Sequence, residues 1–234
     1  MIYQCCYLPQ HEAHIAVDPR YFGVCLQPES LDGLPAFDIR STPPLGEPAI
    51  RQQLCEYAAM LAVWRQRPHP DSWVGFTSWR QFFKGFDFRF DEEALRRVLG
   101  GETICWGMRT LQESLHAHAE RCHPGLTGVL AILLREVHGE SLPDGFFSER
   151  TAPFSNYWAM RWEDFERYMH WSWPVVETAL VRWGLDQPYN LYPRGGTQDR
   201  ALAFLQERLF IVWWLSGRIA RPCLVTPLIS PSPT

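Results

Sequence analysis

Residues 155–184 read SNYWAMRWEDFERYMHWSWPVVETALVRWG, and residues 197–214 read TQDRALAFLQERLFIVWW. In the second segment, large apolar side chains recur at three- and four-residue spacing, as they do on the buried face of a helix. They are Leu202, Leu205, Leu209, Val212 and Trp213. The two segments therefore predict a pair of apolar helices that bracket a Pro/Gly-rich loop and dock on a larger core.

Charged residues accompany this apolar face. Glu207 follows Arg200 by seven residues, which is two helical turns, so the two side chains share one side of the helix. A half-buried charge needs partners. This layout favours an enzyme-like domain.

The composition is typical of a globular protein. The 234 residues are 46% hydrophobic and 21% charged, which predicts one domain over residues 1–224 and a flexible tail over residues 225–234. The net charge of -4, without a basic run, argues against nucleic acid as a partner. Seven scattered cysteines in apolar surroundings resemble reduced core thiols, so we expect a cytoplasmic protein.

The longest apolar run, residues 209–215, is too short for a membrane span, so we expect no transmembrane segment. The sequence does not indicate an oligomeric state.

Strands alternate with helices in the first two thirds of the chain. Strand patterns occupy residues 2–8, 21–26, 73–77 and 104–107, and helical patterns occupy residues 50–65, 91–99, 110–121 and 126–138. Such alternation predicts an α/β fold with a mostly parallel sheet that is covered by helices.

Three segments together resemble one family, the bacterial glycosyltransferase-like proteins of capsule and exopolysaccharide synthesis. The first is CEYAAMLAVWRQ (55–66), the second is SWVGFTSWRQFF (72–83), and the third is the C-terminal pair of helices with Asn156 and Glu207. Three positions depart from the family pattern. Ser78 replaces its histidine, Gln81 replaces its second arginine, and the glycine before the last motif is replaced within residues 201–203.

The resemblance implies a GT-A fold, a Rossmann-like sheet with a helical C-terminal part, whose donor sits at the carboxyl ends of the strands. It also implies transfer of a sugar from a nucleotide-sugar donor to a carbohydrate acceptor in surface-polysaccharide biosynthesis. That fold usually carries an Asp-x-Asp metal motif, which this sequence lacks. Metal dependence therefore stays open between Mn²⁺ or Mg²⁺ bound with the donor and no metal at all.

A leaving diphosphate can be stabilised by a divalent ion or by a bidentate arginine. Arg80 is the candidate for the second route, because it follows the predicted strand 73–77 and should project at the carboxyl edge of the sheet. Ser78 and Trp79 lie beside it, and Trp79 could stack on a base or a sugar. Glu56 leads the first motif and could reach the same edge; the alternative is a structural ion pair between Glu56 and Arg80.

An inverting transfer needs a carboxylate base near the acceptor hydroxyl. Asp199 and Glu207 are the candidates, because they lie on either side of the start of the last helix, close to a Gly-Gly-Thr turn. The alternatives are that Asp199 starts this helix and that Glu207 pairs with Arg200 or Arg208. Arg200 is a further candidate for substrate binding. Asn156 could bind a sugar hydroxyl or satisfy loop amides.

The tryptophans and a cluster of His and Cys residues could suggest ligand sites, but the sequence favours a structural role for both. Most of the eleven tryptophans fall in predicted helices, which indicates core packing rather than sugar stacking. Among them are Trp158, Trp162, Trp171, Trp173, Trp213 and Trp214. His116, His118, Cys122 and His123 form a metal-like cluster, but only His118 and Cys122 share a helix face, so we expect no zinc site.

The competing hypothesis is a catalytically degenerate relative that keeps the fold as a sugar-binding or interaction module. A polar cleft holding Arg80, Glu56 and Arg200 would favour the enzyme, and a cleft filled by Trp79 and Phe82 would favour the module. A hydrolase would need a facing pair of carboxylates, and the sequence nominates none.

Overall fold

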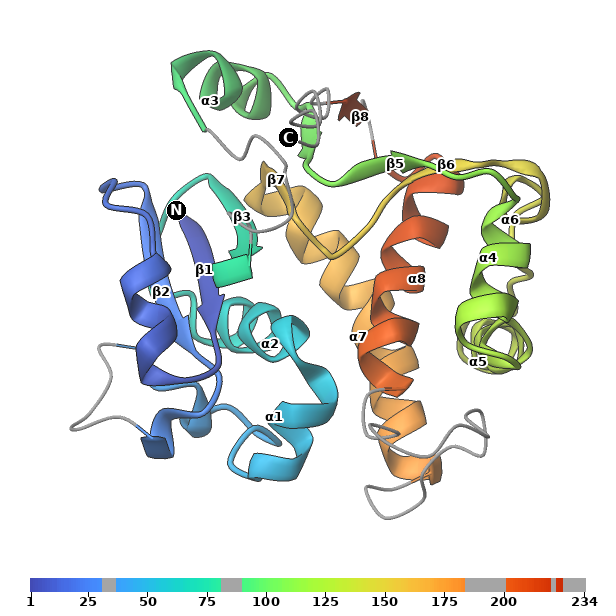
Figure 1. The fold of residues 1–234 in the computed structure, drawn as a ribbon, viewed down its shortest axis with the longest axis horizontal. Helices are drawn as coiled ribbons and strands as arrows, with labels where there is room; N and C mark the ends of the chain where they lie inside the picture. Colours follow the sequence, from blue (N-terminus) through green and yellow to red (C-terminus); the bar gives the residue numbers. More distant parts are fainter. Residues whose placement is uncertain (31–36, 81–89, 184–200, 220–221, 225–234) are drawn as a thin grey trace, which may run out of the picture.

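The computed structural model describes residues 1–30, 37–80, 90–183, 201–219 and 222–224 (Figure 1). The strands are β1 Ile2–Cys6, β2 Tyr21–Cys25, β3 Trp73–Ser78, β4 Thr103–Cys105, β5 Met108–Thr110, β6 Thr151–Pro153, β7 Trp158–Arg161 and β8 Pro222–Leu224. The helices are α1 Pro48–Leu54, α2 Glu56–Gln66, α3 Glu92–Leu99, α4 Leu115–Cys122, α5 Leu126–His138, α6 Gly145–Ser148, α7 Trp162–Trp183 and α8 Ala201–Leu215. Short 3-10 helices are η1 Pro9–His14, η2 Pro28–Ser30 and η3 Ile39–Ser41.

A six-stranded sheet runs in the order β2-β1-β3-β7-β4-β8, and β5 pairs with β6 in a small separate ribbon. Within the described residues, β1 is parallel to β2 and β3, and β4 is parallel to β8. Only β7 runs antiparallel to its neighbours β3 and β4. The predicted α/β fold with a mostly parallel sheet is therefore confirmed.

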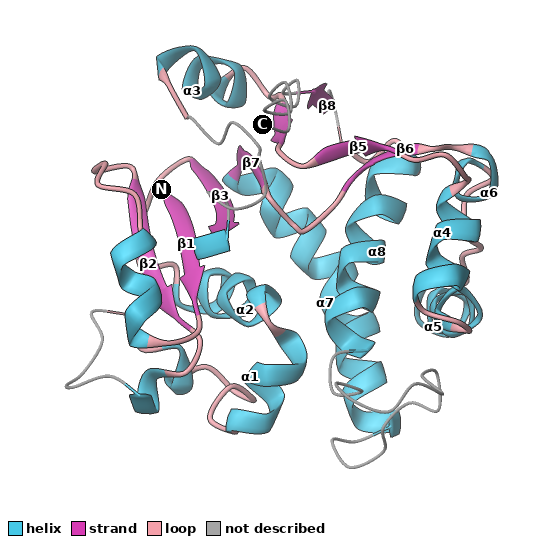
Figure 2. Ribbon diagram, viewed as in Figure 1, coloured by secondary structure: helices cyan, strands magenta, loops and turns pink. Residues whose placement is uncertain are grey.

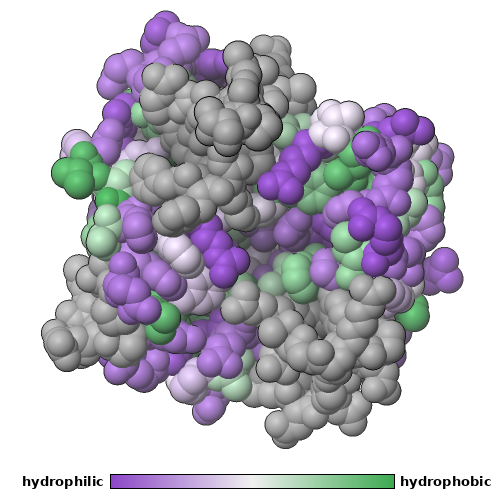
Figure 3. Space-filling view, viewed as in Figure 1, coloured by the Kyte–Doolittle hydropathy of each residue, from purple (hydrophilic) through white to green (hydrophobic). Residues whose placement is uncertain are grey.

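Alternate strand residues point to opposite sides of the sheet. Each face therefore carries buried side chains, and helices pack on both. Tyr3 and Trp158 enter the large core under α2, α7 and α8, whereas Ile2 and Ala159 enter a smaller core on the side of α3. The predicted apolar helix pair is α7 and α8, which lie side by side (Figure 2). On the face drawn in Figure 3, hydrophilic residues predominate, and hydrophobic residues form small separate groups.

The prediction that Trp158 lies in a helix is wrong. It lies in β7, and the helix begins only at Trp162. The segment from Tyr157 to Met160 is buried on both faces of the sheet, so it shows no alternation. Periodicity cannot distinguish such a short apolar run from a buried helix.

The predicted tail over residues 225–234 lies outside the described residues. Among the described residues, no helix is both long enough and apolar enough to cross a membrane.

Gly75 lies in β3 between β1 and β7, where a side chain has little room. An added Cβ would lie 3.0 Å from the Ala159 Cβ, 3.1 Å from the Ile2 Cγ1 and 3.2 Å from the Trp158 carbonyl oxygen. Gly75→Ala should therefore lower the free energy of unfolding by about 1–3 kcal/mol. Gly128→Ala on α5 is the matched control, since its Cβ meets nothing within 4 Å. It should gain about 0.5–1 kcal/mol. Urea denaturation of both variants tests this, and a Gly75→Ala variant as stable as the wild type would contradict it.

Candidate functional site

A cavity of about 190 Å³ lies at the carboxyl edge of β1 and β3. Its described lining is Tyr7, Cys55, Glu56, Arg80, Ser155, Asn156, Ala203, Phe204 and Glu207. Tyr7 and Arg80 follow the carboxyl ends of the two parallel strands. Because β7 is antiparallel to β3, Ser155 and Asn156, which precede β7, reach the same edge. Four predicted site residues, Glu56, Arg80, Asn156 and Glu207, are thus brought together.

Glu56 reaches the cavity because the helix predicted over residues 50–65 is broken at Cys55. Cys55 has φ +48°, its amide donates to the Arg51 carbonyl at 2.9 Å, and its own carbonyl accepts from the Ala58 amide at 3.0 Å. It therefore ends α1 and starts α2 in a new direction. Glu56 becomes the first residue of α2, and the positive end of that helix dipole lies at the cavity, where it favours an anion.

Backbone strain is concentrated in the cavity wall. Cys55, Ser155 and Asn156 have φ values of +48°, +73° and +52°, and they are three of the four non-glycine residues with positive φ in the described chain. Each such residue costs of order 1–3 kcal/mol, and strain of this kind tends to gather at functional sites. Asn156 is only 8% exposed, and its Oδ1 finds no hydrogen-bond donor among the described residues. This buried oxygen therefore has unused capacity to accept a hydrogen bond.

Arg80 is exposed and forms no ion pair within the described residues, so the alternative pairing with Glu56 is not what the structure shows. Its guanidinium lies 5.4 Å from the Trp79 ring centroid. Trp79 does not line the cavity; its ring stacks on His11 at 3.8 Å. The His11 Nδ1 accepts from the Tyr7 amide at 3.3 Å, which ties this stack to the cavity wall.

Ser78, two residues before Arg80, is fully buried. Its hydroxyl is hydrogen-bonded to the Tyr157 hydroxyl, and the Arg80 amide donates to its Oγ at 3.3 Å. Burial, followed by the nearby Glu56 charge, raises the pKa of Tyr157, so this phenol stays protonated. Ser78 thus shapes the turn that carries Arg80 rather than lining the cavity itself.

Glu207 lines the cavity from α8. It pairs with Arg208, which is one of the alternatives that the sequence suggests. Its Oε1 accepts from the Arg208 guanidinium at 3.2 Å. Arg208 is 3% exposed, contacts the His118 Nδ1 at 3.3 Å and lies 5.2 Å from the Phe154 ring centroid. Burial, followed by the Arg208 charge, lowers the pKa of His118, so its neutral ring can accept this hydrogen bond. Arg208 therefore fixes Glu207 and anchors α8 on α4.

The predicted metal-like cluster lies on α4 and at its C-terminal cap, His123. The His118 Nε2 is 3.6 Å from the Cys122 Sγ, whereas His123 stacks on Phe204 at 3.8 Å and His116 lies against Phe147. Burial lowers the pKa of His123 to about 4. In the part of the chain that the structure describes, no group of three His, Cys, Asp or Glu side chains is placed to hold a metal, here or in the cavity.

Two predicted site residues, Asp199 and Arg200, lie outside the described residues. The lining residues that the sequence analysis missed are Tyr7, Cys55, Ser155, Ala203 and Phe204. One of them had a usable signal, because Tyr7 lies near the end of the strand pattern at 2–8, as Arg80 follows the strand at 73–77, and both strands are parallel.

In fold, the chain is similar to a solved structure described as the WbbM bifunctional glycosyltransferase in its apo form. The TM-score is 0.71 at 14% sequence identity, over 98% of this chain and 45% of that chain. The chain thus spans less than half the length of that structure. No family model matches the sequence, and no curated protein matches it. The likeness shows that the chain has a glycosyltransferase-like fold.

Proposed function

We propose that this protein is a cytoplasmic glycosyltransferase that transfers a sugar from a nucleotide-sugar donor to a carbohydrate acceptor in surface-polysaccharide biosynthesis. One observation carries the proposal. Glu56, Arg80, Asn156 and Glu207 come from four separate segments and line one cavity at the carboxyl edge of the sheet. Ligands of open α/β sheets bind at this edge. Six of the seven cysteines are reduced thiols within the described residues, which agrees with a reducing compartment.

Each residue has a role that its surroundings support. Arg80 is exposed and free of carboxylate partners among the described residues, so it can bind the diphosphate beside the N-terminus of α2. The Asn156 Oδ1 and the Glu56 carboxylate accept hydrogen bonds from hydroxyls of the donor sugar. Glu207 takes the proton of the acceptor hydroxyl. The acceptor oxygen then bonds to the anomeric carbon, and the bond from that carbon to the diphosphate breaks.

The described residues do not assemble a set of metal ligands in the cavity, where only two carboxylates, Glu56 and Glu207, are present. We therefore assign no step to Mn²⁺ or Mg²⁺.

The size of the cavity favours a second candidate, a degenerate sugar-binding module. About 190 Å³ is below the range of roughly 300–1,000 Å³ that is usual for small-molecule sites. It accommodates a diphosphate or one sugar ring rather than a whole nucleotide sugar. A module of this kind would bind saccharides without nucleotides.

A thermal-shift screen separates the two candidates. Uridine, guanosine, cytidine and thymidine diphosphates and their sugars are tested with and without Mn²⁺. A ligand at a hundred times its dissociation constant adds about 2.7 kcal/mol, which raises Tm by roughly 5–10 °C for a domain of this size. We expect one nucleotide class to do so, and Arg80→Ala to abolish the shift.

Arg135→Ala is the matched control, because Arg135 is exposed on α5 and lies outside the cavity. It should keep the full shift. A screen in which no nucleotide raises Tm at millimolar concentration would reject the transferase and favour the module.

A further inference from the structure

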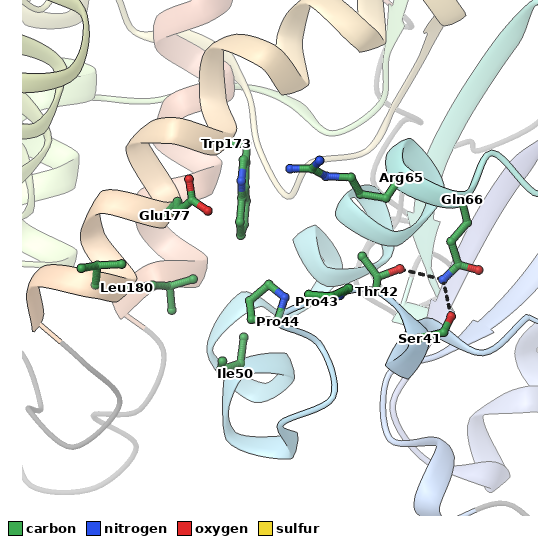
Figure 4. Close-up of a pocket in the computed structure, with 11 residues that line it drawn as sticks. Ser41, Thr42, Pro43, Pro44, Ile50, Arg65, Gln66, Trp173, Glu177 and Leu180 are labelled. Atoms are coloured by element: carbon green, nitrogen blue, oxygen red, sulfur yellow. Dashed lines mark hydrogen bonds between the residues drawn. The ribbon is translucent and has the colours of Figure 1, made fainter.

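A second and larger cavity, of about 650 Å³, lies between α2, α7 and the loop before α1 (Figure 4). Its described lining is Ser41, Thr42, Pro43, Pro44, Ile50, Arg65, Gln66, Trp173, Glu177, Leu180 and Val181, and we call it the α7 groove. It shares no described lining residue with the first cavity. Glu56 and Arg65 lie at opposite ends of α2, roughly 14 Å apart along the helix.

The groove has the form of a small-molecule site. Its volume falls within the usual range of roughly 300–1,000 Å³. Apolar side chains from Pro43, Pro44, Ile50 and Leu180 make up much of the wall. Val181 at its edge is 82% exposed, which is unusual for a large apolar residue. A ligand that covers these side chains would remove apolar surface from water.

Among the described residues, no ion pair or hydrogen bond joins the three polar groups of the groove, which belong to Arg65, Glu177 and Trp173. Arg65 and Glu177 are exposed on different helices, and neither forms an ion pair with the other. Figure 4 shows the Trp173 indole between these two side chains, above Pro44. Trp173 is 5% exposed, yet its Nε1 finds no acceptor among the described residues. An indole, a guanidinium and a carboxylate thus line one space without forming hydrogen bonds to one another.

The opposite wall is held rigidly. The Gln66 Nε2 donates to the Ser41 Oγ at 3.0 Å and to the Thr42 Oγ1 at 2.6 Å, as the dashed lines in Figure 4 show. The Arg65 guanidinium lies 4.4 Å from the Trp64 ring centroid, which positions its donors. A preformed wall lowers the entropy cost of binding.

These contacts select one class of ligand. A hydrocarbon chain would displace water from the exposed Arg65 and Glu177 side chains without replacing the lost hydrogen bonds, which is costly. A phosphate would face the Glu177 carboxylate. A sugar ring has an apolar face that can pack on Trp173 and the apolar wall, and its hydroxyls can donate to Glu177 and accept from Arg65. We propose that the α7 groove binds a neutral oligosaccharide. The inference rests on the groove alone and stands whether or not the first cavity binds a nucleotide.

The test is binding of neutral oligosaccharides to the full chain, measured by saturation-transfer NMR and calorimetry. The probes are maltose, cellobiose, lactose, mannobiose and their tetrasaccharide counterparts. We expect at least one to bind, and Glu177→Ala, Arg65→Ala and the groove-filling Val181→Trp each to weaken it by about tenfold or more. All three positions are exposed, so the variants should fold, which circular dichroism checks.

Glu166→Ala on the same helix and Arg135→Ala on α5 are the matched controls, since both residues are exposed and outside the groove. They should bind within about twofold of the wild type. Arg80→Ala should also keep oligosaccharide binding, so a failed nucleotide screen would not affect this result.

Three results would overturn the proposal. The first is that no probe binds at tens of millimolar concentration. The second is that binding survives all three groove variants, which would place the saccharide elsewhere. The third is that decyl maltoside binds in the groove and maltose does not, because this would show a site for an apolar chain.

Discussion

Replacing Arg51 by methionine should lower the free energy of unfolding by about 3–5 kcal/mol. Arg51 on α1 is 1% exposed. Its guanidinium donates to the Leu26 carbonyl at 3.1 Å, to the Gly46 carbonyl at 3.0 Å and to the Leu45 carbonyl, and it pairs with Glu29. Methionine can replace the apolar stem of the arginine but none of these bonds. Buried carbonyls would therefore be left without donors.

The measurement is chemical denaturation at neutral pH, with two controls. Arg51→Lys keeps the charge but not the fork of donors, so it should fall between the wild type and the methionine variant. Arg40→Met removes a partly exposed arginine that pairs with Asp38, and it should cost far less stability than Arg51→Met. If Arg51→Met loses no more stability than the Arg40 control, then Arg51 does not hold the loop after β2 against the loop before α1.

The carboxyl edge of the sheet could be predicted because it depends on local pattern. The strands at Ile2–Cys6 and Trp73–Ser78 are short, apolar and bounded by turn residues, and parallel pairing follows from the helices between them. Residues that follow parallel strands then meet at one edge. Arg80 lies at this edge after the second strand, and Tyr7 lies there after the first.

The rest of the cavity depends on long-range packing. The spacing of apolar residues predicts one continuous helix, but the chain breaks it at Cys55. A cysteine with positive φ has no sequence signature. Ser155 and Asn156 reach the edge only because β7 inserts antiparallel beside β3, and the apolar run of β7 resembles the start of a helix.

The α7 groove could not be predicted for a related reason. Its walls come from a loop that carries Pro43 and Pro44, the end of α2, and the outer part of α7. Trp173 and Glu177 share a helix face in any helical model, but only the tertiary fold places Arg65 opposite them. Trp173 is buried, as its place in an apolar helical pattern indicates, but the missing acceptor for its N–H depends on the tertiary structure.

Glu207→Gln should lower turnover by about 10²–10⁴-fold, which is the usual contribution of a general base. The prediction rests on the proposed transferase, and the assay is release of nucleoside diphosphate from the donor that the thermal-shift screen identifies. Glutamine has nearly the shape of glutamate and keeps an oxygen that can accept from Arg208. Loss of the charge beside a buried arginine will lower stability, so turnover is measured well below the Tm of the variant. Donor binding should remain, because the diphosphate is assigned to Arg80.

Glu56→Gln is the control within the same cavity, since it removes the other carboxylate. If Glu56 only binds the donor sugar, its loss should raise KM for the donor more than it lowers kcat. The reverse pattern, with turnover nearly unchanged in Glu207→Gln and lost in Glu56→Gln, would contradict the assignment. The base would then lie at the N-terminus of α2, and the contact between Glu207 and Arg208 would serve only to hold α8 against α4.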